Sequence, residues 1–166
     1  MKSDKATFGE IWFKDISLKL ISNLDQLSRS GLSIALLTER LEKLKNIKLT
    51  MAMKKPEKLA FWLNVYCNLM IYAILKRKWK DNKDLVFKNR FDKWSFFNKN
   101  LISINGINRS LKDIEKIILD LDPRTLFLAI NETHRNTIRR NPFIAETIMD
   151  EIDKATKTVV NDSEYV

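Results

Sequence analysis

The feature that most constrains the fold is one long apolar segment near the middle of the chain. Between Leu59 and Leu75 almost every side chain is apolar or aromatic, and lysines and arginines flank the segment on both sides. Pro56 suits the first turn of a helix, and Glu57 places a negative charge near the positive end of the helix dipole. Because apolar residues occupy nearly every side of this helix, the pattern predicts a buried core helix over 57–78.

A membrane span is the competing interpretation of the same segment. A span needs roughly 20 consecutive apolar residues. Here Asn64 and Asn68 interrupt the run, and their amides would cost free energy in lipid. We therefore expect a core helix and no membrane span.

Asn64, Cys67 and Asn68 lie on one face of the predicted helix, since they are three and four residues apart. A buried amide without hydrogen bonds destabilises a fold by about 1–3 kcal/mol. A polar partner must therefore meet this face. It is either main chain from a neighbouring loop or a ligand in a cleft.

Three blocks of the sequence occur in a recognisable order. They are Phe61-Trp62-Leu63-Asn64-Val65-Tyr66 continuing into 71–75, then Ser110-Leu111-Lys112-Asp113-Ile114-Glu115, then Asp122-Pro123-Arg124 followed by 127–131. Together they resemble the Phe-Trp-Ile-Asn-x-Tyr-Asn, Ser-Leu-x-Asp-Ile-Glu and Asp-Pro-Arg elements of domain-of-unknown-function family 547. The resemblance covers residues 56–160 and implies a shared scaffold.

The chain departs from that family at the family's reactive positions. Family cysteines are replaced here by Glu132 and Thr137, and family histidines by Tyr72 and by the apolar segment 126–128. The family's second helix asparagine corresponds to Cys67. The resemblance thus implies a catalytically degenerate scaffold that acts as a binding or interaction protein, with a protein or peptide as its expected partner.

The loop 131–141 is where the resemblance implies a site. The expected binding residues are Asn64, Asn68, Asn131, His134, Arg135, Arg139 and Arg140. The alternative is a cysteine-dependent hydrolase or transferase, in which Glu132 would orient His134 to activate Cys67. The sequence does not fix these three side chains within hydrogen-bond reach. One His and one Cys are too few for a zinc site, and the chain has no phosphate-binding glycine loop, so we expect no metal and no cofactor.

Positive charge is concentrated in the middle of the chain. Residues 54–99 contain twelve Lys and Arg against four Asp and Glu, and the whole chain carries +9. Basic and aromatic side chains alternate there, a pattern that can follow a phosphate backbone and stack on bases. A nucleic-acid-binding protein is therefore a second alternative, through a basic patch formed by Lys76, Arg77, Lys78, Lys80, Lys88, Arg90 and Lys93.

The length of 166 residues suits one domain of the mostly helical α+β class. Residues 1–53 are predicted to form a helical hairpin packed on the core at 54–166. Its first helix starts near Thr7 and ends near Gly31. Its second helix has an apolar stripe that runs through Ile34, Leu37, Leu41, Leu44, Ile47 and Met51.

The remaining elements are predicted from turn and cap signals. Asn105-Gly106 indicates a β-hairpin over 101–109, and Ser110 with Asp113 indicates the start of a helix that stops before Asp122. The short apolar run 126–130 is predicted to be a further strand of the sheet. Pro142 is predicted to open the last helix, with Ile144, Ile148, Ile152, Ala155 and Val159 on one face.

The single cysteine cannot form an internal disulfide, and no apolar run follows the first residues. These features predict a cytoplasmic protein, or a secreted one if a leader has been removed.

Overall fold

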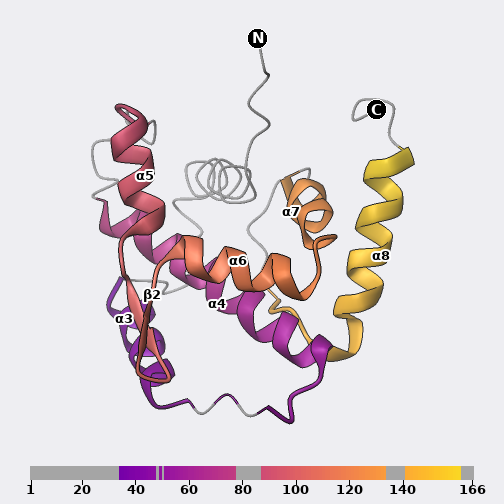
Figure 1. Ribbon diagram of the computed structural model, residues 1–166, viewed down its shortest axis with the longest axis horizontal. Helices are drawn as coiled ribbons and strands as arrows, with labels where there is room; N and C mark the ends of the chain where they lie inside the picture. Colours follow the sequence, from indigo (N-terminus) through magenta and orange to yellow (C-terminus); the bar gives the residue numbers. More distant parts are fainter. Residues whose placement is uncertain (1–33, 48, 50, 78–86, 134–140, 162–166) are drawn as a thin grey trace.

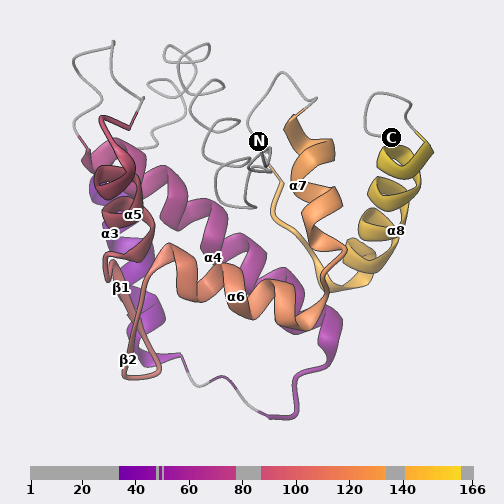
Figure 2. The ribbon, with the colours of Figure 1, turned by 45° about the horizontal axis from the view of Figure 1, so that its top comes forward.

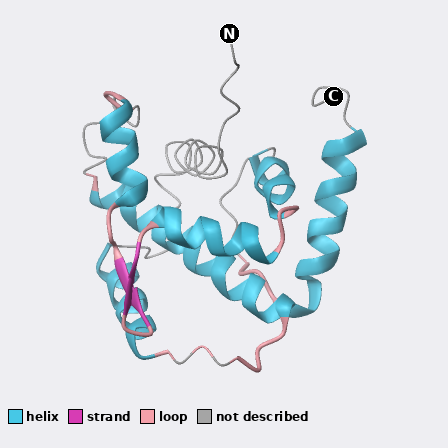
Figure 3. Ribbon diagram, in the orientation of Figure 1, coloured by secondary structure: helices cyan, strands magenta, loops and turns pink. Residues whose placement is uncertain are grey.

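The computed structural model describes residues 34–47, 49, 51–77, 87–133 and 141–161. Helices dominate this part of the chain: α3 (Ile34–Lys43), α4 (Lys55–Lys76), α5 (Arg90–Asn98), α6 (Leu111–Leu121), α7 (Thr125–Thr133) and α8 (Ala145–Asn161), with a 3-10 turn η1 (Leu44–Asn46). Strands β1 (Ile102–Ile104) and β2 (Ile107–Arg109) form a two-stranded antiparallel sheet (Figure 3). The predicted mostly helical α+β class is confirmed.

Helix α4 is the centre of the fold. It packs against α3, α6 and α8, and it contributes fully buried side chains such as Leu63, Leu69 and Ile74. Figures 1 and 2 both show α4 and α6 side by side, with α7 and α8 at one end and α3, α5 and the hairpin at the other. The predicted core helix is thus confirmed, beginning and ending two residues earlier than expected.

Among the described helices, α4 alone has the length and apolar composition that could cross a membrane. More than half of its apolar segment is buried within the protein, and the core helix of a soluble protein can have the same length and composition. Packing against three other helices accounts for its apolar sequence without a bilayer.

The hairpin and the start of α6 form as their local sequences predict. Asn105 and Gly106 adopt φ angles of 53° and 73°, the left-handed region that a type I′ turn requires at both central positions. The Ser110 hydroxyl accepts from the Asp113 N–H at 3.2 Å, and the Asp113 carboxylate accepts from the Ser110 N–H at 2.8 Å. This reciprocal cap fixes where α6 begins.

The predicted strand over 126–130 is wrong, because these residues belong to helix α7. Main-chain N–H groups of Thr125 and Leu126 already donate to the carbonyls of Asp122 and Pro123, three residues back in each case. Asp followed by Pro is a helix-start signal as well as a stop for the preceding helix. A short apolar run cannot by periodicity alone be assigned to strand rather than buried helix.

Two helix boundaries also differ from expectation. The apolar stripe was predicted to continue to Met51, but α3 ends at Lys43 and the Met51 side chain is 99% exposed. Helix α8 begins at Ala145 rather than at Pro142, and both main-chain polar groups of Phe143 instead bond to the side chain of Asn64, as described below. The predicted first helix of the N-terminal hairpin lies outside the described residues.

Candidate functional site

Asn64 of α4 is tied to the main chain that leads into α8. Its amide nitrogen donates to the Phe143 carbonyl at 2.8 Å, and its Oδ1 accepts from the Phe143 N–H at 2.8 Å. One side chain thereby satisfies both main-chain groups of a residue 79 positions away. Asn68 donates to the Asn64 carbonyl at 2.8 Å within the same helix. Of the two partners left open by the sequence, the structure shows main chain from a neighbouring segment; a ligand-binding role for either amide stays a prediction.

Tyr66 and Cys67 follow Asn64 on α4 and contact the core. Tyr66 is fully buried, and burial raises the pKa of its phenol well above the ordinary value, with further increases from the charges of Glu115 and Cys67. The phenol therefore stays protonated at neutral pH. The buried Glu115 carboxylate is paired with the Lys112 ammonium at 3.0 Å. Cys67 is half-buried and packs against the hydrophobic core.

The Asp-Pro-Arg element forms an ionic cluster rather than an open site. The Asp122 side chain is 3% exposed and accepts from Arg124 at 2.8 and 3.0 Å and from the Lys55 ammonium at 3.0 Å. These bonds, from Arg124 first, hold the pKa of Asp122 well below its ordinary value. Arg124 also pairs with Asp153. The cluster thus joins the start of α4, the α6–α7 turn and α8.

The predicted site loop lies mostly outside the described part of the chain. Asn131 and Glu132 belong to the last turn of α7, but their side chains are not among those described. The other expected loop residues fall in 134–140, outside the described residues: His134, Arg135, Arg139 and Arg140. Whether Cys67 has His134 as a neighbour therefore stays a prediction.

The predicted basic patch contains one cation that packs against the fold, Arg77, and others that are mostly exposed to solvent. The Arg77 guanidinium lies 5.1 Å from the ring centroid of Phe87 and 5.8 Å from that of Phe96. It also forms an ion pair with Asp92, which lowers the pKa of that carboxyl. The others are Lys76, Lys88 and Arg90, which are exposed, Lys93, which is half-buried, and Lys78 and Lys80, which lie outside the described residues.

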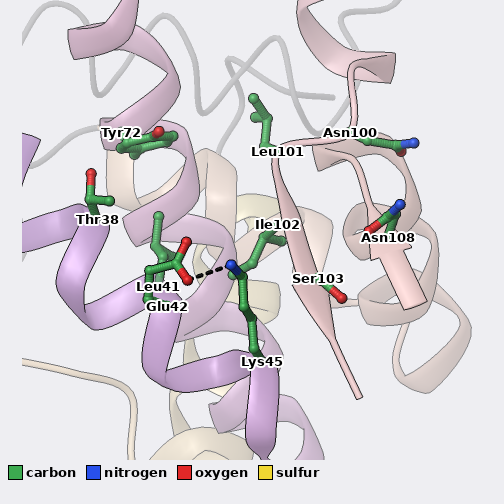
Figure 4. Close-up of a pocket in the computed structure, with 10 residues that line it drawn as sticks. All are labelled: Thr38, Leu41, Glu42, Lys45, Tyr72, Asn100, Leu101, Ile102, Ser103 and Asn108. Carbon is green, nitrogen blue, oxygen red and sulfur yellow. Dashed lines mark ion pairs between the residues drawn. The ribbon is translucent and has the colours of Figure 1, made fainter. Parts of the chain in front are cut away.

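The α3–hairpin hollow is a cavity of about 380 Å³ between α3 with η1, the β-hairpin and one turn of α4. In Figure 4 the α3 side chains lie on one side, Leu101 and Ile102 of the hairpin segment lie nearest to them, and Tyr72 lies at one end, while Asn100, Ser103 and Asn108 lie on the far side of β1 in this view. The lining residues are Thr38, Leu41, Glu42, Lys45, Tyr72, Asn100, Leu101, Ile102, Ser103 and Asn108.

The lining of the hollow is polar and nearly neutral. Glu42 and Lys45 form an ion pair with each other, so their charges largely cancel. Asn100, Ser103 and Asn108 make no side-chain hydrogen bond to another residue in the ranges that the structure describes, and each can both donate and accept. Leu101 is half-buried and adds a small apolar part to the surface, whereas Leu41 and Ile102 are only 6% and 8% exposed. This combination can bind a neutral ligand with alternating polar and apolar groups.

Sequence reasoning missed the hollow because its walls come from distant segments. Thr38 and Asn108 are brought together only when α3 and the hairpin both pack at the same end of α4. The only sequence signal was the polarity of Asn100, Ser103 and Asn108 around a hairpin whose other face is buried.

Comparison with known proteins gives one match. The profile of the family described as "Protein of unknown function, DUF547" matches residues 50–159, about two thirds of the chain. No curated protein and no solved structure matches. Within the described residues, no group of three His, Cys, Asp or Glu side chains is placed to hold a metal ion.

Proposed function

The chain belongs to the DUF547 family of proteins of unknown function, and from this premise we propose that it is a binding protein whose site is the α3–hairpin hollow. Its ligand in this proposal is an extended peptide segment of a partner protein. The observation that carries the proposal is the lining of the hollow, in which uncharged amide and hydroxyl groups accompany the half-buried side chain of Leu101.

The family-motif residues support binding over catalysis because the fold already uses their polar groups. The amide of Asn64 holds Phe143, the hydroxyl of Ser110 caps α6, and the carboxylate of Asp122 holds Arg124 and Lys55. A general acid or base must present its proton-accepting or donating atom to a substrate. These groups instead face other parts of the protein.

A peptide fits the hollow better than a charged ligand does. Peptide groups each offer one donor and one acceptor, which matches the dual capacity of Asn100, Ser103 and Asn108. In an extended peptide alternate side chains point to the same side, so one apolar side chain can lie against Leu101, the half-buried leucine of the lining. The volume of about 380 Å³ falls within the range of ligand pockets.

The thiol-enzyme alternative has less support. A nucleophilic cysteine needs a stabilised thiolate and access to solvent. Cys67 is half-buried and packs against the core of the protein. The alkylation experiment in the Discussion tests this alternative separately.

The test is selection of binding peptides followed by blocking of the hollow. A library of random 12-residue peptides is selected on the wild-type protein, and affinities are measured by fluorescence polarisation. Asn108→Trp places a large side chain in the hollow at an exposed strand position that tolerates aromatic residues. Lys157→Trp, on the exposed surface of α8, is the matched control.

Selected peptides should bind Asn108→Trp at least about tenfold more weakly than wild type, a loss of roughly 1.4 kcal/mol. Binding to Lys157→Trp should be unchanged. The proposal fails if selection yields no peptide, or if the peptides bind the hollow-filling variant as tightly as wild type.

A further inference from the structure

Helix α5 carries a pair of exposed aromatic rings that lie outside the hydrophobic core of the described residues. Phe91 is 74% and Trp94 is 60% exposed, whereas Phe97, three residues after Trp94 on the same helix, is buried. The two exposed rings stack on each other, with centroids 6.0 Å apart and planes inclined by 24°. Large aromatic side chains this exposed, and in contact with each other, indicate an interaction surface.

The orientation of α5 is fixed, so these rings are held outward. Phe96 and Phe97 both pack against Phe87, with ring centroids 5.4 and 5.9 Å apart. Asp92, on the same helix, is bonded to Arg77 and to the N–H of Lys88. The helix cannot rotate Phe91 and Trp94 inward without breaking these contacts.

The outward face of α5 is also positively charged. Arg90 is four residues before Trp94 and therefore adjacent to it on the helix surface. Arg90 is exposed, and so is Lys88, which lies two residues before the start of the helix. The one acidic residue of the helix, Asp92, is already paired with Arg77 and does not cancel the charge of Arg90 or Lys88.

We infer that the α5 face, formed by Lys88, Arg90, Phe91 and Trp94, binds single-stranded nucleic acid. Bases stack on the rings of Phe91 and Trp94, and phosphates contact Lys88 and Arg90. Aromatic rings beside cations are the combination used by proteins that bind single strands without reading their sequence. This face shares no residue with the α3–hairpin hollow, so it does not depend on the peptide-binding proposal.

An anionic membrane is the other partner that a basic aromatic face could meet. Helices that lie in a membrane interface expose a continuous apolar side that includes aliphatic residues. Phe91 and Trp94 are the only large hydrophobic side chains exposed on α5. The observations therefore favour bases over lipid.

The experiment measures anisotropy of labelled 15-nucleotide single strands with the full chain. One strand is oligothymidine and the other is an abasic strand of equal length, which has the same phosphates but no bases. The stacking variant is Phe91→Ala with Trp94→Ala, and Trp94→Phe is the conservative control because it retains a ring. Urea unfolding checks that the variants fold as wild type does.

Wild type should bind oligothymidine more tightly than the abasic strand. Loss of a base-stacking ring weakens binding by about 5- to 150-fold per base. The affinity of the stacking variant should fall at least about fivefold for oligothymidine and stay unchanged for the abasic strand. Trp94→Phe should retain most of the affinity for oligothymidine. Lys88→Gln with Arg90→Gln should weaken both strands equally and reduce the salt slope by about 1.4.

Three outcomes overturn the inference. One is no binding of oligothymidine at 50 mM salt, a concentration at which phosphate contacts are strong. Another is equal affinity of wild type for the thymidine and abasic strands. The third is binding to vesicles of phosphatidylserine and phosphatidylcholine, but not to either strand, which would assign the face to a membrane.

Discussion

Replacement of Asn64 by Ala removes both hydrogen bonds that hold Phe143 to the central helix. Each neutral hydrogen bond contributes about 0.5–1.5 kcal/mol net, and a buried group left unpaired costs more. The Phe143 side chain is only 3% exposed, so water reaches its main chain poorly. Alanine recovers a few tenths of a kcal/mol because it favours the helix. We expect a net loss of about 2–3 kcal/mol in the free energy of unfolding.

Asn68→Ala is the matched control, one turn further along α4. Within the described ranges its amide bonds only to the Asn64 carbonyl in the same helix, so no hydrogen bond between segments of this part of the chain is lost. A change within about 0.5 kcal/mol is expected for it. Urea unfolding at 25 °C measures both, and amide hydrogen exchange at Phe143 should become faster in Asn64→Ala alone. The reasoning is refuted if the two variants lose equal stability.

Asn64→Asp makes one of the two hydrogen bonds to Phe143 depend on pH, because only a protonated carboxyl can donate to the Phe143 carbonyl. An ionised carboxylate can still accept from the Phe143 N–H, but it faces the Phe143 carbonyl without a proton to donate. Folding should therefore raise the pKa of the introduced carboxyl. A group whose pKa is raised by folding stabilises the folded state at pH values below its unfolded pKa of about 3.9, and this stabilisation is lost as the pH increases. The deficit relative to wild type should shrink as the pH is lowered from 7 to 4.

Three further predictions concern the motif residues. Folding depresses the pKa of Asp122, so the stabilisation by its carboxylate is present above the unfolded pKa of about 3.9 and is lost as pH falls below that value. Asp122→Asn should therefore be less stable than wild type at pH 6 and lose less stability between pH 5 and 2. Equal losses of unfolding free energy in the two proteins, measured by urea unfolding, would count against this. Ser110→Ala should cost about 1 kcal/mol by removing the α6 cap, whereas Ser110→Asp, which retains a capping oxygen, should cost less in the same urea assay. Cys67 should react with iodoacetamide much more slowly in the folded protein than in urea, and rapid alkylation that rises with pH in the folded state would restore the thiol-enzyme alternative.

Features set by a few adjacent residues were predictable from the sequence. The turn at Asn105-Gly106 and the cap at Ser110 depend on local main-chain geometry, and both formed where expected. The core helix was predictable because its composition admits burial on all sides. Asn64 was identified as needing a polar partner, although Phe143 could not be named.

Features set by distant segments were not predictable in the same way. Leu126–Ile130 became helix because the preceding Asp-Pro starts a helix and because α7 packs on α8, and the apolar run alone does not distinguish that result from a strand. The start of α8 was displaced by the contact of Phe143 with a residue 79 positions earlier. The α3–hairpin hollow exists only in the folded chain, so residue spacing gave no sign of it.

The most direct test of the account is where a selected peptide binds. Titration of the isotope-labelled protein with such a peptide, followed by NMR amide shifts, should change the signals of Thr38, Asn100, Ser103 and Asn108 first and most. Signals of Cys67 should stay unchanged. Shifts centred on Cys67, with the hollow unaffected, would contradict the proposal that this protein binds its partner between α3 and the hairpin.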